Sequence, residues 1–133
     1  MSLPKKDILY LKFAALLHDI GKVGKLTQLK NHPVAGADIV SNIKKLNKIV
    51  PAIRHHHENY DGTGYPDKLY GNEIPLFSRI IAVADYFDHN CESKYNLNIT
   101  LKEIEKLSGV NFDPEVVKVF LNIYEKINQK QIN

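Results

Sequence analysis

Residues 8–17 predict the element around which the fold is built; they read Ile8-Leu9-Tyr10-Leu11-Lys12-Phe13-Ala14-Ala15-Leu16-Leu17. Apolar residues in this run cover most of a helical surface rather than one stripe, a pattern typical of a helix that is packed on several sides. We therefore expect a central and largely buried helix. It should end near Asp19 or Ile20 and break at Gly21, since glycine is common just past a helix end.

Two further helices are expected in the N-terminal half. Pro33 suits the first turn of the second helix, where its missing N–H costs nothing. The third should begin around Asn47 or Lys48 and end near Glu58. Pro51 is compatible with that helix because it falls within the first turn.

The C-terminal half continues in helical periodicity. Residues 76–88 predict a fourth helix. Thr100 and Glu103 have the spacing of a capping box at the start of a short fifth helix, and Asp113-Pro114 predicts the start of the last one. No segment shows a sustained strand alternation, so we predict an all-α fold, a bundle of about five to six helices.

Residues 59–75 predict a long ordered loop between the third and fourth helices. Asp-Gly, Thr-Gly, Tyr-Pro and Ile-Pro pairs follow one another there, and such pairs mark turns. Loops of this length inside compact domains commonly carry function. The aromatic residues Tyr60, Tyr65 and Tyr70 favour an ordered conformation.

Composition restricts the class of protein. The 133 residues suit one domain, and 44% hydrophobic with 25% charged residues is typical of a soluble globular protein. No apolar run approaches the roughly 20 residues that cross a membrane, and the single Cys91 excludes an internal disulfide framework. The net charge of +3 is mild and spread along the chain. We expect a cytoplasmic protein that binds neither a membrane nor a nucleic-acid polymer.

Histidines and carboxylates stand where the predicted helices end or begin, and one more aspartate lies within an apolar helix. Such places can meet at one end of a bundle, where a metal ion would find several ligands and open coordination positions. Imidazole and carboxylate together suit iron, manganese, zinc or nickel. The candidate metal ligands are His18, Asp19, His32, His56, His57 and Asp85.

Two metal ions explain this set better than one. Adjacent helical residues point about 100° apart, so His56 and His57 cannot easily share one ion. Asp19 could bridge both ions while the two histidines serve different faces. Two ions roughly 3.5–4 Å apart could hold a hydroxide and stabilise in-line displacement at phosphorus, which is a phosphoesterase reaction.

Each residue taken alone has a structural alternative. A helical His-Asp pair commonly lies on the surface, and His32 could simply cap a helix. Asp85 needs a partner inside an apolar helix, and Arg79 or Lys22 could neutralise it without any metal. The glycines of the loop could serve only its turns. It is the joint pattern that favours metal binding.

The chain resembles the HD-GYP family of metal-dependent phosphohydrolases. The segment His18-Asp19-Ile20-Gly21-Lys22 is similar to its HD motif, and His56-His57-Glu58 through Gly64-Tyr65-Pro66 is similar to its signature loop. The likeness runs from about Phe13 to Phe120. It implies an HD-domain-like helical bundle that hydrolyses the bacterial second messenger cyclic di-GMP with a metal-activated hydroxide.

The resemblance also implies roles for individual residues. It makes the six candidate ligands the holders of two divalent transition metal ions, iron, manganese or zinc. Asp19 would be the catalytic bridging ligand, and Lys22 would contact the scissile phosphate or the attacking water. The implied substrate-binding residues are Asp61, Gly64, Tyr65, Pro66 and Lys94.

The chain departs from the family pattern in three places. It begins too close to His18 to hold the family's N-terminal helices, and the segment between His18 and His32 is short. Lys94 stands where the family has an arginine, and lysine cannot make the planar bidentate contact of a guanidinium. We therefore expect residues 1–133 to form a single HD-GYP-like domain without those helices.

Two other functions remain open from the sequence. One is an HD-superfamily phosphohydrolase acting on another nucleotide, and the other is a catalytically weak signalling or interaction module that keeps the fold. An uncovered apolar surface near Leu9 and Phe13 would favour a homodimer. Sensory or receiver domains could accompany this domain in a parent protein.

Overall fold

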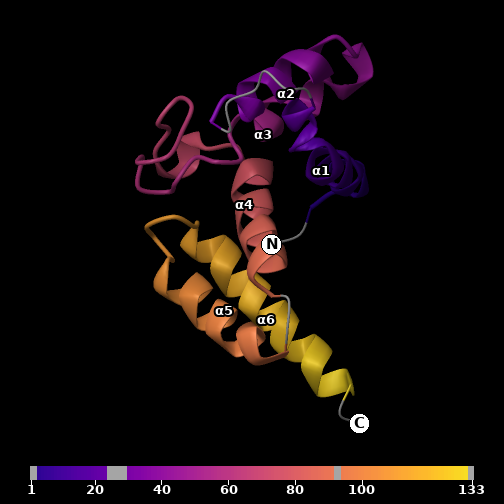
Figure 1. Cartoon of the computed structure of the whole chain (residues 1–133). Coiled ribbons are helices and arrows are strands. Elements are labelled where there is room, and N and C mark those ends of the chain that lie inside the picture. The colour runs from indigo at the N-terminus through magenta and orange to yellow at the C-terminus, as the bar shows by residue number, and fades with distance from the viewer. Residues whose placement is uncertain (1–2, 24–29, 92–93, 132–133) are drawn as a thin grey trace.

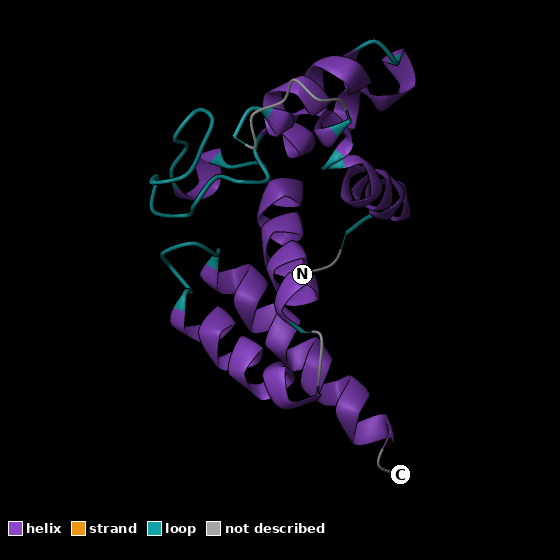
Figure 2. Cartoon of the chain, in the orientation of Figure 1, coloured by secondary structure: helices purple, strands orange, loops and turns teal. Residues whose placement is uncertain are grey.

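A computed structural model describes residues 3–23, 30–91 and 94–131, apart from the side chains of residues 94, 95, 130 and 131. Helices are the regular elements of the described residues, which confirms the predicted all-α class (Figure 2). No helix in these ranges has the length and apolar content to cross a membrane. The α-helices are α1 (Lys5–Leu17), α2 (His32–Ser41), α3 (Val50–Arg54), α4 (Leu76–Asn90), α5 (Lys94–Lys106) and α6 (Pro114–Gln131); the 3₁₀ helices are η1 (Ile20–Lys22), η2 (Lys44–Ile49) and η3 (Gly71–Glu73).

Helix α4 lies between two groups of helices, α1 to α3 at one end and α5 with α6 at the other (Figure 1). It contributes to two hydrophobic cores. Ile81 belongs to the core shared with α1, α2 and α3, whereas Val83 belongs to the core shared with α5 and α6. These two positions are about 200° apart around a helix, so α4 packs on both sides.

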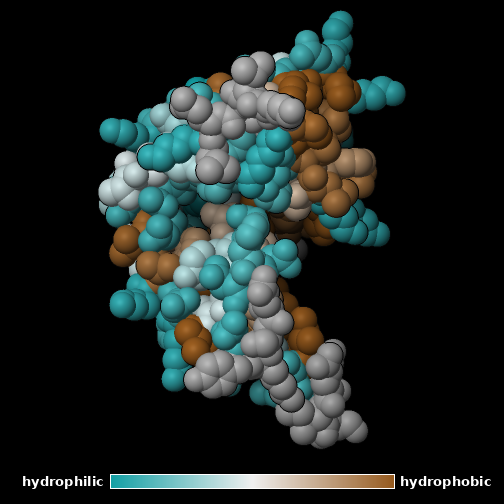
Figure 3. Space-filling view, in the orientation of Figure 1, coloured by the Kyte–Doolittle hydropathy of each residue, from teal (hydrophilic) through white to brown (hydrophobic). Residues whose placement is uncertain are grey.

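Helix α1 is much more exposed than its composition predicts. Among its residues Ala14 alone is buried, while Leu9 is 53% exposed and Leu16 is 80% exposed. Helix α1 packs against η2, α3 and α4, and its remaining apolar side chains add to a hydrophobic surface beside α2 (Figure 3). The expectation of a largely buried helix was wrong, because apolar residues all round a helix are buried only if neighbours exist on every side.

Two predicted helix boundaries also differ. The third helix is short, since α3 ends at Arg54 and residues 55–57 form a turn rather than continuing to Glu58. The capping box at Thr100 was wrong, because α5 begins before it. Thr100 is buried inside α5, and its hydroxyl lies 2.8 Å from the carbonyl oxygen of Asn96, a hydrogen bond to the preceding turn.

Residues 59–75 form the expected long loop, which carries η3. Two backbone hydrogen bonds hold its start: the N–H of Tyr60 donates to the Asn111 carbonyl, and that of Asp61 donates to the Val110 carbonyl. The loop is therefore fastened to the turn between α5 and α6. This contact brings the loop to one side of α4, next to the end of α3 (Figure 1).

Candidate metal centre

Gly21 allows η1 to approach the start of α2 very closely. A Cβ atom at this position would overlap the carbonyl oxygen of His32 and lie 2.5 Å from the backbone nitrogen of Gly36. No other residue fits there without moving the backbone. The close approach brings Asp19, which precedes η1, within reach of His32 at the start of α2.

Four of the predicted ligands form a compact cluster, which we call the Asp19 cluster: Asp19, His32, His56 and His57. The Nε2 atom of His32 lies 3.1 Å from the Nε2 atoms of both His56 and His57. Asp19 Oδ1 lies 3.2 Å from the same His32 nitrogen and 3.8 Å from His56 Nε2. One ligand atom from each residue lies within 4.8 Å of all the others, a spacing at which one ion could contact the whole set.

The other two predicted ligands, His18 and Asp85, lie beside each other, with His18 near the second carboxylate oxygen of Asp19. His18 Nε2 is 3.5 Å from Asp19 Oδ2 and 3.4 Å from Asp85 Oδ1, while Lys22 Nζ is 2.6 Å from Asp19 Oδ2. The two oxygens of Asp19 therefore face two different groups of side chains. This is the arrangement that a bridging carboxylate requires.

Arg79 and Lys22, the two cations that could have neutralised Asp85 without a metal, pair with other carboxylates. Arg79 pairs with Asp113 at 2.6 Å, and Lys22 pairs with Asp19. Asp85 instead lies 3.1 Å from His89 Nδ1 and close to His18. The suggestion that Arg79 or Lys22 neutralises Asp85 was wrong, because both cations are held by nearer carboxylates.

Backbone carbonyls orient two of the imidazole rings. His56 Nδ1 lies 2.6 Å from the carbonyl oxygen of Ile53, and His18 Nδ1 lies 2.7 Å from that of Ala15. A carbonyl oxygen can only accept, so each Nδ1 carries the proton. In the neutral ring the Nε2 lone pair then points toward the cluster, which is the tautomer that a metal ligand needs.

The electrostatics keep His56, His57 and Asp19 in their metal-binding protonation states, whereas the adjacent Asp85 carboxylate raises the pKa of His18. Burial, followed by the charge of His57, lowers the pKa of His56 to about 3. Burial and the charge of His32 lower the pKa of His57 to about 4. Burial alone would raise the pKa of Asp19, but the hydrogen bond from Lys22 and the charge of His18 outweigh it and lower the pKa. Neutral imidazoles thus face an ionised carboxylate at neutral pH.

Unpartnered atoms show that the site fits a bound cation. His18 Nε2 and Asp19 Oδ1 are inaccessible to solvent and form no hydrogen bond to the described residues. Buried polar atoms nearly always have a partner. Imidazole nitrogen and carboxylate oxygen are ligands that divalent transition metals share. This cluster could therefore bind such a metal, as the sequence predicted.

A cavity of about 440 Å³ adjoins the cluster, and His56 and His57 lie in its wall. Two of the predicted substrate-binding residues, Gly64 and Tyr65, line it, and the Tyr65 ring stacks on His57 with centroids 5.1 Å apart. A Cβ atom at Gly64 would overlap the backbone at residues 58 and 59. The other lining residues are Lys30, His56, His57, Glu58, Asn59, Thr63, Ala82, Asp85, Tyr86, Leu107, Asn111 and Phe112.

Of the remaining predicted substrate-binding residues, Asp61 and Pro66 lie outside this wall. The Asp61 carboxylate accepts hydrogen bonds from the backbone N–H and the hydroxyl of Thr63, and so closes a turn. Pro66 follows Tyr65 through a cis peptide bond and is not among the cavity-lining residues. Lys94 is the first residue of α5, and its side chain lies outside the described residues.

Sequence reasoning missed several polar residues of the cavity. Asn111 donates to Asn59 Oδ1 at 3.0 Å, and Asn59 donates to Thr63 Oγ1 at 3.0 Å. Asn59 and Asn111 are 52 positions apart, so no local pattern could pair them. Glu58 is buried and accepts two loop N–H groups, from Asp67 at 2.7 Å and Leu69 at 3.2 Å. Its position just before the loop was the one available signal.

Comparisons with known proteins agree with this geometry. Residues 1–116 match the family model described as the HD domain. The cyclic di-GMP phosphodiesterase response regulator RpfG of Xanthomonas campestris is 33% identical, over 97% of this chain and 40% of the relative. A cyclic di-GMP phosphodiesterase of Thermotoga maritima is 34% identical, over 96% of this chain and 40% of the relative.

The fold is also found among solved structures. The crystal structure of a cyclic GMP-AMP specific phosphodiesterase of Vibrio cholerae aligns with a TM-score of 0.80 and 24% identity, covering 93% of this chain and 40% of that one. The chain spans about 40% of the length of each of these proteins. Both the family match and the Asp19 cluster lead to one conclusion: this chain belongs to the HD domain family.

Proposed function

We propose that this chain is a metal-dependent phosphodiesterase domain that hydrolyses a cyclic dinucleotide, with cyclic di-GMP as the first candidate. The observation that carries the proposal is the meeting of Asp19, His32, His56 and His57 beside a cavity of about 440 Å³, whose wall includes His56 and His57. A cavity of this size suits a small-molecule ligand. The names of the relatives in Xanthomonas and Thermotoga support a cyclic di-GMP substrate.

Two divalent ions, iron, manganese or zinc, would be held by His18, Asp19, His32, His56, His57 and Asp85. When bound, such ions supply Lewis-acid stabilisation of charge at phosphorus and assist the activation of water. The chain's own contribution is to fix the ligands. The Nδ1 hydrogen bonds of His18 and His56 hold their rings in the correct tautomer, and Asp19 presents one oxygen to each side.

Lys22 is proposed to stabilise the phosphate. Its side chain is 44% exposed, and its ammonium group lies 2.6 Å from Asp19 Oδ2, at the edge of the cluster. From there it can neutralise part of the charge that develops on the phosphate oxygens. Lysine acts as a point charge, which suits this role without a bidentate contact.

The loop and the α5–α6 turn are proposed to hold the nucleotide. Tyr65 offers an aromatic face beside His57, and the hydrogen-bonded pair Asn59 and Asn111 offers amide groups along the same cavity. Aromatic faces stack on bases, and amides can recognise base edges. Asp61 and Pro66 would shape the loop, and Lys94 would supply a charge from α5.

The test is turnover by the full chain after loading with Mn²⁺, Fe²⁺ or Zn²⁺. Cyclic di-GMP is incubated with the protein, and the linear product, formed by addition of one water across one phosphodiester, is separated by chromatography. Asp19→Ala should abolish turnover, whereas Asp38→Asn, an exposed carboxylate of α2, should not change it. Turnover of 3′3′-cGAMP or another nucleotide alone would replace the substrate assignment. Metal binding without any turnover would favour the weak signalling module.

Several partner and context proposals accompany this function. We propose that residues 1–133 form a single HD-GYP-like domain, that the domain acts in the cytoplasm, and that it works beside sensory or receiver domains of a parent protein. The exposed side chains of Leu9 and Leu16 are proposed to contact a second copy in a homodimer. Sedimentation of the wild type and of Leu16→Ser tests the dimer, since the variant should shift the equilibrium toward monomer.

A further inference from the structure

The three consecutive histidines at the end of α3 do not face the same site. His56 and His57 direct their Nε2 atoms to the Asp19 cluster. His55 instead places its Nδ1 atom 3.7 Å from Glu58 Oε1 and 3.5 Å from Asp67 Oδ2. We call His55, Glu58 and Asp67 the loop cluster. One ligand atom from each lies within 4.8 Å of the other two.

His55 Nδ1 has no ordinary partner. The atom is inaccessible to solvent and forms no hydrogen bond to the described residues. Its distances to the two carboxylate oxygens are at or beyond the usual limit for a hydrogen bond. A buried ring nitrogen that points between two carboxylates but reaches neither calls for something between them.

The spacing of these atoms suits a shared metal ion. Ligands at 2.0–2.2 Å from a tetrahedral ion are separated by about 3.3–3.6 Å. The separation of 3.5 Å from His55 Nδ1 to Asp67 Oδ2 lies within this range, and the 3.7 Å to Glu58 Oε1 lies just above it. Imidazole nitrogen and carboxylate oxygen both bind zinc, and three protein ligands leave the fourth position of a tetrahedral ion to water. The side chain of Asp67 is 37% exposed, so that water can reach the position from solvent.

Neighbouring groups orient both carboxylates. Glu58 Oε1 accepts the N–H of Asp67 at 2.7 Å, and Glu58 Oε2 accepts that of Leu69 at 3.2 Å. Arg54 donates to both oxygens of Asp67, at 2.8 and 2.9 Å. Hydrogen bonds of this kind hold metal ligands in place. Arg54 also neutralises one of the two carboxylates, so an ion here should bind more weakly than at the Asp19 cluster.

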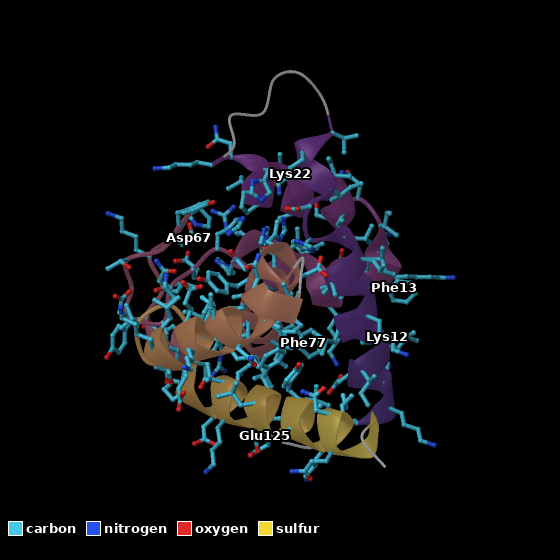
Figure 4. All side chains as sticks on the ribbon, turned by 60° about the horizontal axis from the view of Figure 1, so that its bottom comes forward. Lys12, Phe13, Lys22, Asp67, Phe77 and Glu125 are labelled. Atoms are coloured by element: carbon cyan, nitrogen blue, oxygen red, sulfur yellow. The ribbon has the colours of Figure 1, made fainter. Side chains whose placement is uncertain are left out.

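We propose that His55, Glu58 and Asp67 form a separate binding site for a divalent metal ion, with Zn²⁺ as the best match. The bound ion fastens the loop to the end of α3. The site shares no residue with the Asp19 cluster. Its effect is structural: Asp67 lies two residues after Tyr65, whose ring stacks on His57. In Figure 4 the labelled Asp67 lies on the loop, whereas the labelled Lys22 lies at η1 beside the Asp19 cluster.

The experiment separates the two sites by variants of the full chain. Metal is removed with chelator, and Zn²⁺ or Co²⁺ is then titrated into the wild type, Asp19→Asn, Asp67→Asn and the double variant. In the Asp19→Asn protein we expect one equivalent to bind with the visible absorption of tetrahedral Co²⁺. The added Asp67→Asn change should remove that equivalent and its absorption. Asp67 is exposed, so its variant is expected to fold, and circular dichroism checks this.

Arg54→Gln is the matched control, because it breaks the Arg54–Asp67 pair but leaves the three ligands in place. The Arg54→Gln protein should retain the ion. Loss of the ion in both Arg54→Gln and Asp67→Asn would show that ion binding depends on the Arg54–Asp67 pair and not on Asp67 as a ligand, and would overturn the proposal. Zn²⁺ should also slow hydrogen exchange at the Leu69 amide of the Asp19→Asn protein. Absence of any Asp67-dependent ion there would overturn the proposal too. Neither measurement uses turnover, so its outcome is independent of whether the proposed phosphodiesterase function is correct.

Discussion

The Asp19 cluster and the loop cluster lie on the two sides of one short run, His55-His56-His57, and they are assembled in different ways. The Asp19 cluster takes its members from the end of α1, the start of α2 and the turn after α3. The loop cluster takes all three members from within 13 residues. The first therefore depends on how helices pack, whereas the second depends on how one loop closes on itself.

This difference has a consequence for the chemistry. Neighbouring residues in a turn can serve separate sites, because their side chains diverge from the backbone. Identical residue types thus acquire different surroundings: burial lowers the pKa of His56 to about 3, whereas His55 faces Glu58 and Asp67. A histidine run in a sequence predicts metal ligands, but it does not by itself predict which ligands share an ion.

The largest expected effect is a difference in kcat/KM between alanine variants of two nearby histidines, His57 and His55. His57→Ala should remove a ligand of the Asp19 cluster and lower kcat/KM by about 1000-fold or more, as loss of a residue essential to the reacting site does. His55→Ala should keep metal at the Asp19 cluster and lose no more than about tenfold, because it acts through the loop. Metal analysis and cyclic di-GMP turnover measure both. Equal losses in the two variants would contradict the division into two clusters.

The next effect concerns the close packing of η1 against α2, on which the Asp19 cluster depends and the loop cluster does not. Gly21→Ala places a Cβ atom on the backbone of α2, so we expect the free energy of unfolding to fall by about 2–4 kcal/mol. Gly62→Ala is the control in the loop. There φ is 80°, but the nearest atom is 3.6 Å away, so strain alone should cost about 1 kcal/mol. Urea denaturation of metal-free protein compares them, and a smaller loss for Gly21→Ala would refute the argument.

The loop side can be weakened through Glu58. Glu58→Gln replaces one of two accepting oxygens with an NH₂ group, which leaves a loop N–H unpaired and should cost about 1–3 kcal/mol. Glu73→Gln is the matched control, since Glu73 accepts the Tyr70 N–H at an exposed site. It should cost less than about 1 kcal/mol. Thermal unfolding and hydrogen exchange at Leu69 measure the difference.

A smaller effect should follow from lowering the pH from 7.5 to 5.5. The pKa of His56 is about 3 in the fold and 6.5 in the unfolded chain, so below pH 6.5 the unfolded chain binds more protons. The contribution of His56 to the stability of the metal-free protein should be greatest above pH 6.5. From there down to about pH 3 the contribution of His56 falls by about 1.4 kcal/mol per unit. Denaturation of chelated protein at pH 7.5 and 5.5 checks the sign. His56→Ala should reduce the change of unfolding free energy with pH. An unchanged slope in this variant would contradict the assignment of the pH effect to His56.

Much of this molecule follows from local sequence. The caps and periodicity around Pro33 and Asp113-Pro114 predicted the starts of α2 and α6, and the turn pairs of residues 59–75 predicted the loop. The residue types at 18, 19, 32, 56 and 57 predicted a metal site before any geometry was known. Helix caps, turns and ligand types are properties of neighbouring residues, and this is why they can be read from the chain.

Only the tertiary structure decided which of these residues meet, and which surfaces are covered. Leu16 is 80% exposed although its helix is apolar, because burial needs a neighbour that periodicity does not specify. Asp85 pairs with His18 and His89, and Asn59 reaches Asn111 across 52 residues, because packing brings distant segments together. The sequence by itself determined the helices, the loop and the kind of chemistry. Packing determined the partners, since distances between remote residues exist only in the folded chain.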